Sequence, residues 1–125
     1  MPIPSSLRTW FLIHFSIDYL LGLPLLFFPQ WALQLFGFAA VESVTAHLVG
    51  AALLAIGGIS LLVRNEKKEV YTALLKLKLI WSGSAITGLI ISLIEVFQKS
   101  TVFFLAIFIF FFFLWGYYLK KLIKK

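Results

Sequence analysis

The chain has 125 residues, of which 62% are hydrophobic and 13% are charged, whereas a typical soluble domain carries about 25% charged residues. A soluble domain of this size cannot hide so much apolar surface from water, so the composition predicts a membrane protein with one domain over residues 1–125. The absence of cysteine excludes disulfides, thiolate metal sites and a thiol nucleophile. The net charge of +6 does not indicate nucleic-acid binding, because the basic residues end apolar runs, where they meet anionic lipid headgroups.

Four apolar runs are long enough to cross a membrane, which needs about 20 residues. They extend from about Arg8 to Phe28, Val44 to Val63, Leu74 to Phe97 and Thr101 to Leu119. The predicted fold is therefore all-α, a polytopic bundle of four transmembrane helices. Ser5 or Ser6 is expected to provide the N-cap of the first helix.

The first external loop, "PQWALQLFGFAAVES", is long for a connection between two antiparallel helices. Pro29 suits the first position of a helix, and Gly37 suits its end. These signals favour a short helix lying in the outer membrane interface. The alternative is an irregular loop.

The basic residues predict the orientation of the spans. Of the eleven Lys and Arg residues, only Lys99 falls on one side. The other ten are Arg8, Arg64, Lys67, Lys68, Lys76, Lys78, Lys120, Lys121, Lys124 and Lys125. The positive-inside rule then predicts a multi-pass protein of the inner membrane with both termini in the cytoplasm. Lys76 and Lys78 are expected to extend to the nearby interface.

Small residues predict how the spans pack, because they let membrane helices approach closely. Ala46 and Gly50 are four residues apart in the second span, and Ser84, Gly88 and Ser92 form a similar stripe in the third. The second and third spans are therefore expected to form the inner pair. The Phe-rich fourth span has few small residues and is expected to be peripheral.

The stretch "FLIHFSIDYL" carries the clearest candidate site. His14, Asp18 and Gly22 are spaced by four residues and form one stripe of the first helix. A charge facing lipid at mid-depth costs about 2.5–3.5 kcal/mol, so Asp18 is expected to face the bundle, within reach of His14 or of a third-span hydroxyl such as Ser84 or Thr87. This polar group is either a functional site or a structural contact between helices.

His47 lies near the outer end of the second span and either touches the wet interface or belongs to a polar vestibule above Asp18. At about 1.5 Å per residue, His14 and His47 are roughly 15 Å apart in depth, so they cannot share a haem iron or a zinc ion. No cofactor or metal is expected. A catalytic set could combine His14 and Asp18 with Ser16 or Ser84, but no nucleophile-elbow or phosphate-loop motif accompanies it.

The stretches "LLGLPLLFFPQWALQLFG" and "AHLVGAALLAIGGISLLVRNE", together with Trp81 in the third span, resemble the small four-helix bacterial membrane proteins grouped as DoxX-like. The resemblance covers nearly the whole chain. It implies a four-helix membrane fold and, for some members, a likeness to quinone-linked oxidoreductase subunits. Such relatives are expected to carry Arg near the place of His47, so this chain departs from the pattern there.

The sequence leaves three functions open. The first is binding of a small lipid-soluble or protonatable ligand at a polar intramembrane site. The candidate ligand-binding residues are Asp18, His14, Ser84, Thr87, Trp81 and His47. The second is a non-catalytic accessory subunit that packs against a partner membrane subunit or a second copy through its fourth span. The third is an intramembrane enzyme in which Asp18 and His14 perform acid–base chemistry.

Overall fold

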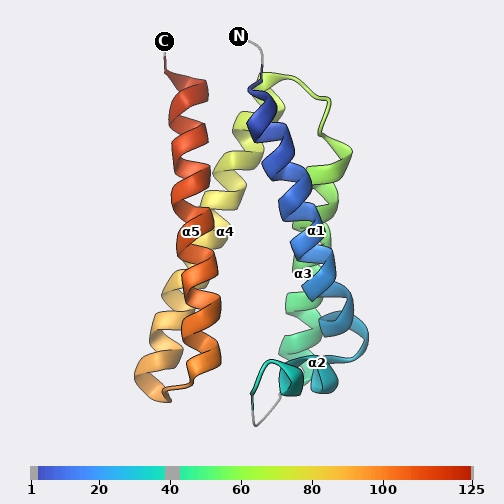
Figure 1. The fold of residues 1–125 in the computed structure, drawn as a ribbon, viewed down its shortest axis with the longest axis vertical. Coiled ribbons are helices and arrows are strands. Elements are labelled where there is room, and N and C mark those ends of the chain that lie inside the picture. Colours follow the sequence, from blue (N-terminus) through green and yellow to red (C-terminus); the bar gives the residue numbers. More distant parts are fainter. Residues whose placement is uncertain (1–2, 39–42, 125) are drawn as a thin grey trace. The chain divides into compact units, whose positions relative to one another are not determined.

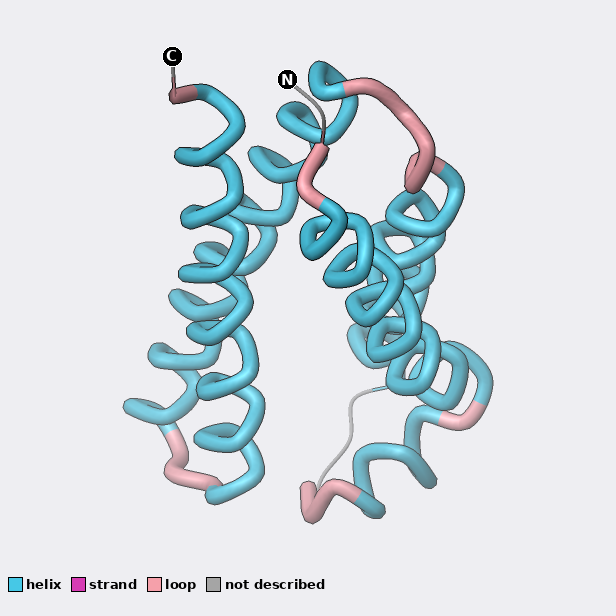
Figure 2. The backbone as a smooth tube through the Cα atoms, turned by 45° about the horizontal axis from the view of Figure 1, so that its top comes forward, coloured by secondary structure: helices cyan, strands magenta, loops and turns pink. Residues whose placement is uncertain are grey.

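The computed structural model describes residues 3–38 and 43–124, and these residues form helices joined by short loops, with no strand (Figures 1 and 2). The helices are α1 (Ser5–Phe27), α2 (Pro29–Leu35), α3 (Ser43–Leu62), α4 (Lys68–Glu95) and α5 (Lys99–Ile123). All but α2 are long and apolar enough to cross a membrane. The predicted all-α membrane fold with four candidate spans is confirmed. The chain divides into two compact units, one with α1 to α3 and one with α4 and α5.

Three helices extend further than the apolar runs indicate: α1, α4 and α5, the last of which covers Lys99–Ile123 where the run covers Thr101 to Leu119. α1 already begins at Ser5, and Pro4 precedes it without a side-chain capping bond. The prediction that Ser5 or Ser6 caps this helix is therefore wrong, because the Pro4 carbonyl already accepts the amides of Leu7 and Arg8 at 3.1 and 3.4 Å. α4 begins at Lys68, six residues before the apolar run at Leu74, because polar residues can continue a helix beyond the apolar segment.

The short helix predicted after the first span is present as α2. Pro29 occupies its first turn, where the missing proline N–H costs nothing because that amide has no partner in a helix. Gly37 follows the helix with a φ of 93°, a left-handed conformation that glycine adopts without steric cost. The two sequence signals therefore mark both ends of α2.

In the first unit, α1 packs along α3 through a continuous seam of buried residues (Figure 1). The α1 side of the seam is Leu7, Phe11, His14, Asp18, Gly22 and Leu25, and the α3 side is Ala46, Gly50, Leu53, Gly57 and Ser60. Every spacing in both rows is three or four residues, which is typical of helices that pack at a shallow angle. A Cβ atom on Gly50 would lie 2.5 Å from the Leu26 nitrogen, so glycine permits direct contact between the two backbones.

In the second unit, α4 packs along α5 with a seam of the same period. Tyr71, Leu75, Lys78 and Ser82 are buried on α4, and Phe111, Trp115, Tyr118 and Leu122 are buried on α5. The Phe-rich helix thus has a packed face against α4, and its peripheral place in the bundle stays a prediction. Large aromatic side chains of α5 fill the space beside small residues of α4, as Phe112 does 3.5 Å from the Cβ position of Gly83.

The stripe of Ser84, Gly88 and Ser92 takes no part in the α4–α5 seam. All three residues are exposed, and no atom lies within 4 Å of a Cβ atom built on Gly88. The small-residue pattern predicts a packed face here, and the structure leaves it open because α5 covers the neighbouring face that carries Leu75, Lys78 and Ser82.

Arg8 makes a hydrogen bond between the first turn of α1 and the chain just beyond α3. Its Nη1 donates to the carbonyl of Arg64, just beyond the C-terminus of α3, while Arg64 Nη1 donates to the Leu61 carbonyl at 2.8 Å. The last carbonyls of a helix have no intrahelical donor, and cationic side chains also favour the negative end of the helix dipole. Arg8 therefore fastens the start of α1 to the end of α3.

We expect Arg8→Ala to lower the free energy of unfolding by about 1 kcal/mol, the usual contribution of one such hydrogen bond. Thermal unfolding in detergent measures this change. Lys124→Ala is the control, because Lys124 is an exposed basic residue beyond the end of α5. Equal melting temperatures for the two variants would show that the Arg8 contact does not stabilise the protein.

Candidate functional site

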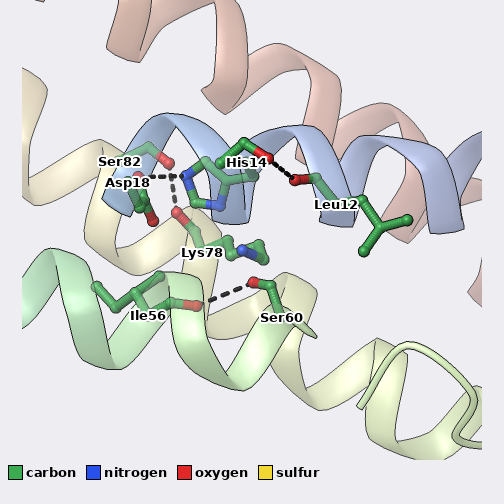
Figure 3. A network of polar contacts seen from close by, with 8 residues as sticks. Leu12, His14, Asp18, Ile56, Ser60, Lys78 and Ser82 are labelled. Atoms are coloured by element: carbon green, nitrogen blue, oxygen red, sulfur yellow. Dashed lines mark hydrogen bonds and ion pairs between the residues drawn. The ribbon is translucent and has the colours of Figure 1, made fainter. Parts of the chain in front are cut away.

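The centre of the candidate site is a histidine–aspartate pair on one face of α1. His14 Nε2 lies 3.4 Å from Asp18 Oδ1 (Figure 3). Both residues are buried, with 5% and 3% of their surface exposed. The predicted contact between Asp18 and His14 is therefore present. At about 1.5 Å per residue, Asp18 lies only about 3 Å from the midpoint of α1.

α3 closes one side of this pair. A Cβ atom on Gly57 would lie 2.7 Å from Asp18 Cβ and 3.2 Å from Asp18 Oδ2. The absence of a side chain at Gly57 thus lets the carboxyl group lie directly against the backbone of α3. This contact leaves no room for a ligand between Asp18 and Gly57, so a ligand would have to reach the pair from another side.

Ser16 does not complete a catalytic set with this pair. It is exposed, and its hydroxyl donates to the Leu12 carbonyl at 2.9 Å. Two residues along a helix correspond to a rotation of about 200°, so Ser16 lies on the opposite side of α1 from His14 and Asp18. The Ser16 hydroxyl therefore does not reach His14, which could not act as its general base.

The α4 residues of the predicted site lie in the other unit. Ser84 and Thr87 are exposed, and the Thr87 hydroxyl donates to the Gly83 carbonyl at 2.9 Å. Trp81 packs edge-on against Phe108, with ring centroids 6.0 Å apart, and its indole nitrogen is buried without an acceptor among the described residues. The grouping of these side chains with Asp18 stays a prediction.

Lys78 is a buried polar residue that the sequence interpretation missed. It is completely buried, and its ammonium lies 4.9 Å from the centre of the Trp115 ring. The prediction that Lys78 extends to the interface is therefore wrong. Lys76, by contrast, is exposed. A cation over an indole face is stabilised by the ring quadrupole. Ser82, one turn further, is also buried and donates to the Lys78 carbonyl (Figure 3).

A usable signal for Lys78 and Ser82 does exist in the sequence. Together with Tyr71 and Leu75 they follow the alternating spacing of four, three and four residues that marks the packed face of a helix. Lys76 does not fall on one of these positions, and it is exposed. The position of a lysine in this period, rather than its distance from the helix end, separates the buried side chain from the exposed one.

His47 lies at the end of the first unit where α1 finishes, away from the His14–Asp18 pair near the middle of α1. Its Nδ1 contacts the carbonyl of Leu26, near the C-terminus of α1. Leu26 is twelve residues beyond His14, which corresponds to about 18 Å along the helix. His14 and His47 therefore do not form one site, and no group of three His, Cys, Asp or Glu residues in the described part of the chain could hold a metal ion.

Comparison with known proteins adds no relative to this geometry. No family model, no curated protein and no solved structure matches the chain.

Proposed function

We propose that this chain is a multi-pass protein of the inner membrane whose His14–Asp18 pair binds a small lipid-soluble or protonatable ligand within the membrane. The observation that supports the proposal is the burial of this pair, with 3.4 Å between Nε2 and Oδ1, near the middle of a candidate span. Ionisable side chains at this depth are costly and most often mark ligand or proton sites. Imidazole and carboxyl groups exchange protons readily, which suits a ligand that carries a titratable group.

Asp18→Asn tests this proposal, because the amide keeps the size of the carboxyl group and removes its charge. The protein is purified in mild detergent, and its organic extract is analysed by mass spectrometry for small molecules that co-purify. We expect a compound that is present with the wild type and depleted at least about tenfold with Asp18→Asn, a loss of about 1.4 kcal/mol in binding. Ser16→Ala is the control, since Ser16 is exposed on the opposite side of α1.

Two outcomes distinguish binding from a structural role. If Asp18→Asn retains the same compounds as the wild type, the pair is not a ligand site. If Asp18→Leu lowers the melting temperature while Asp18→Asn changes neither stability nor bound compounds, the pair serves to hold α1 and α3 together. Acid–base catalysis by the same pair would require a reaction product in the extract that Asp18→Asn abolishes.

An accessory role is the second candidate, and the open face of α4 favours it. Ser84, Gly88 and Ser92 are exposed, and small exposed residues at this spacing suit contact with another membrane helix. A partner subunit or a second copy would cover this face. Native mass spectrometry of the wild type and of Gly88→Leu tests it, because a bulky side chain would separate such an assembly without disturbing the α4–α5 seam.

The proposed orientation has both termini in the cytoplasm, because ten of the eleven basic residues lie on that side. We expect a reporter that is active only outside the cytoplasm to be inactive when fused after Lys124. The same reporter fused after Phe97, between α4 and α5, is expected to be active and serves as the control. The opposite pattern would reverse the topology. A DoxX-like organisation remains part of the proposal and is supported by the Gly and Pro pattern of the first two spans.

A further inference from the structure

A pocket of about 410 Å³ lies where α1 passes into α2 beside the first turn of α3. Three aromatic residues, Phe27, Phe28 and Trp31, and three polar residues, Gln30, Ser43 and His47, contribute to its lining. The pocket belongs entirely to the first unit. It is separate from the His14–Asp18 pair, because Asp18 lies nine residues before Phe27, or about 14 Å along α1 by the helical rise.

The contact between His47 and Leu26 determines the chemistry of the imidazole. Leu26 is one of the last residues of α1, so its carbonyl has no donor from the helix. A carbonyl oxygen only accepts, and therefore His47 Nδ1 must carry the hydrogen in the contact that joins them. In the neutral imidazole this leaves Nε2 as a hydrogen-bond acceptor. His47, which contributes to the lining of the pocket, thus carries a hydrogen-bond acceptor at Nε2.

The pocket lies at the end of two candidate spans, since α1 ends at Phe27 and α3 begins at Ser43. The ends of transmembrane helices lie at the level of lipid headgroups. Phe27, Phe28 and Trp31 are 63%, 67% and 58% exposed, so their surfaces are available to a molecule in this layer. The natural occupant of such a position is a phospholipid.

The residues that line the pocket favour one class of phospholipid headgroup over the others. Among the lining residues that the structure describes, His47 is the one titratable side chain, so none of them brings a permanent positive charge to an anionic headgroup. Aromatic faces attract organic cations, and the acceptor on His47 suits a group that donates hydrogen bonds. A primary ammonium satisfies both requirements, whereas a quaternary ammonium cannot donate and an anionic glycerol headgroup carries no cation.

We propose that this pocket binds the ethanolamine headgroup of phosphatidylethanolamine, with the ammonium donating to His47 Nε2 and lying against the aromatic rings. The side chains of Ser43 and Gln30 are the hydrogen-bond donors available to the lipid phosphate. The site would hold a lipid at the outer end of α1 and α3. It does not depend on any ligand at His14 and Asp18.

The test measures lipid retention by native mass spectrometry of the whole protein released from mixed micelles. The micelles contain equal amounts of phosphatidylethanolamine, phosphatidylcholine and phosphatidylglycerol. We expect the wild type to retain phosphatidylethanolamine about fivefold better than either of the others. A hydrogen bond of about 1 kcal/mol to His47, which choline cannot donate, gives this preference over phosphatidylcholine, and a cation–π contact of about 1 kcal/mol gives it over phosphatidylglycerol. Equal retention of the three lipids, or a preference for phosphatidylglycerol, would overturn the proposal.

Two variants locate the site. His47→Asn has no acceptor atom in the place of Nε2, so the preference over phosphatidylcholine is expected to disappear while the melting temperature stays within a few degrees. Phe28→Leu is expected to reduce the preference about twofold, through loss of one aromatic face. Phe97→Leu is the control, because Phe97 is an aromatic residue, 69% exposed, at the end of α4 and outside the pocket. If His47→Asn keeps the wild-type preference, the assignment to this pocket is wrong.

A competition experiment separates a lipid from a soluble amine. Free phosphoethanolamine is added to the same micelles at up to the concentration of the lipid. We expect it to leave the retained phosphatidylethanolamine unchanged, because it lacks the acyl chains that hold the lipid against the membrane-facing aromatic residues. Displacement by phosphoethanolamine would overturn the assignment to a lipid and place a soluble amine in the pocket.

Discussion

Replacing Gly50 by alanine is expected to disrupt the first unit more than any other substitution of a single hydrogen by a methyl group. The added Cβ atom would lie 2.5 Å from the Leu26 nitrogen and 2.9 Å from the Gly22 carbonyl oxygen. Both are backbone atoms, so no side-chain rotation relieves the overlap and α1 must move away from α3. Overpacking of this kind typically costs about 1–3 kcal/mol. We expect the upper part of this range, measured as the free energy of unfolding in detergent.

Gly88→Ala is the matched control for this substitution. Gly88 also lies inside a candidate span, but no atom lies within 4 Å of its Cβ position. Alanine favours the helix over glycine by up to about 1 kcal/mol, so the free energy of unfolding should be unchanged or raised. If Gly50→Ala and Gly88→Ala unfold at the same temperature, the close approach of α1 and α3 at Gly50 does not exist.

Reversing the charge of Lys78 is expected to have the second large effect. In Lys78→Glu a carboxyl group replaces the ammonium that lies 4.9 Å from the Trp115 ring centre. The ring face attracts cations and repels anions, and a desolvated cation–π contact contributes about 2 kcal/mol. We therefore expect Lys78→Glu to destabilise the α4–α5 pair by at least about 2 kcal/mol. Loss of monodisperse protein in size-exclusion chromatography, or a lower unfolding temperature, measures this.

Two further variants test whether the effect depends on the buried position and on the charge of residue 78. Lys76→Glu makes the same change two residues away at an exposed position and is expected to be nearly neutral. Lys78→Met keeps most of the side-chain volume without a charge, and its stability should fall between those of the wild type and Lys78→Glu. Equal stability of Lys76→Glu and Lys78→Glu would show that Lys78 does not lie inside the α4–α5 seam.

The local signals in the sequence were sufficient for the elements themselves. Long apolar runs give four candidate spans because each helix satisfies its own backbone hydrogen bonds in a membrane. Pro29 and Gly37 define α2 because their backbone conformations are decided within a few residues. The contact of His14 with Asp18 is equally local, since two residues four apart on one helix are always neighbours.

The sequence by itself thus determined the helices, their composition and the one polar pair that lies within a single helix. The tertiary structure decided what the helices face: Gly57 against Asp18, the contact of α5 with α4, the burial of Lys78 and the contact of His47 with the last turn of α1. The physical reason is that a lipid-facing surface and a helix-facing surface are both apolar. Hydropathy therefore does not distinguish them, and only the shapes of the packed side chains do.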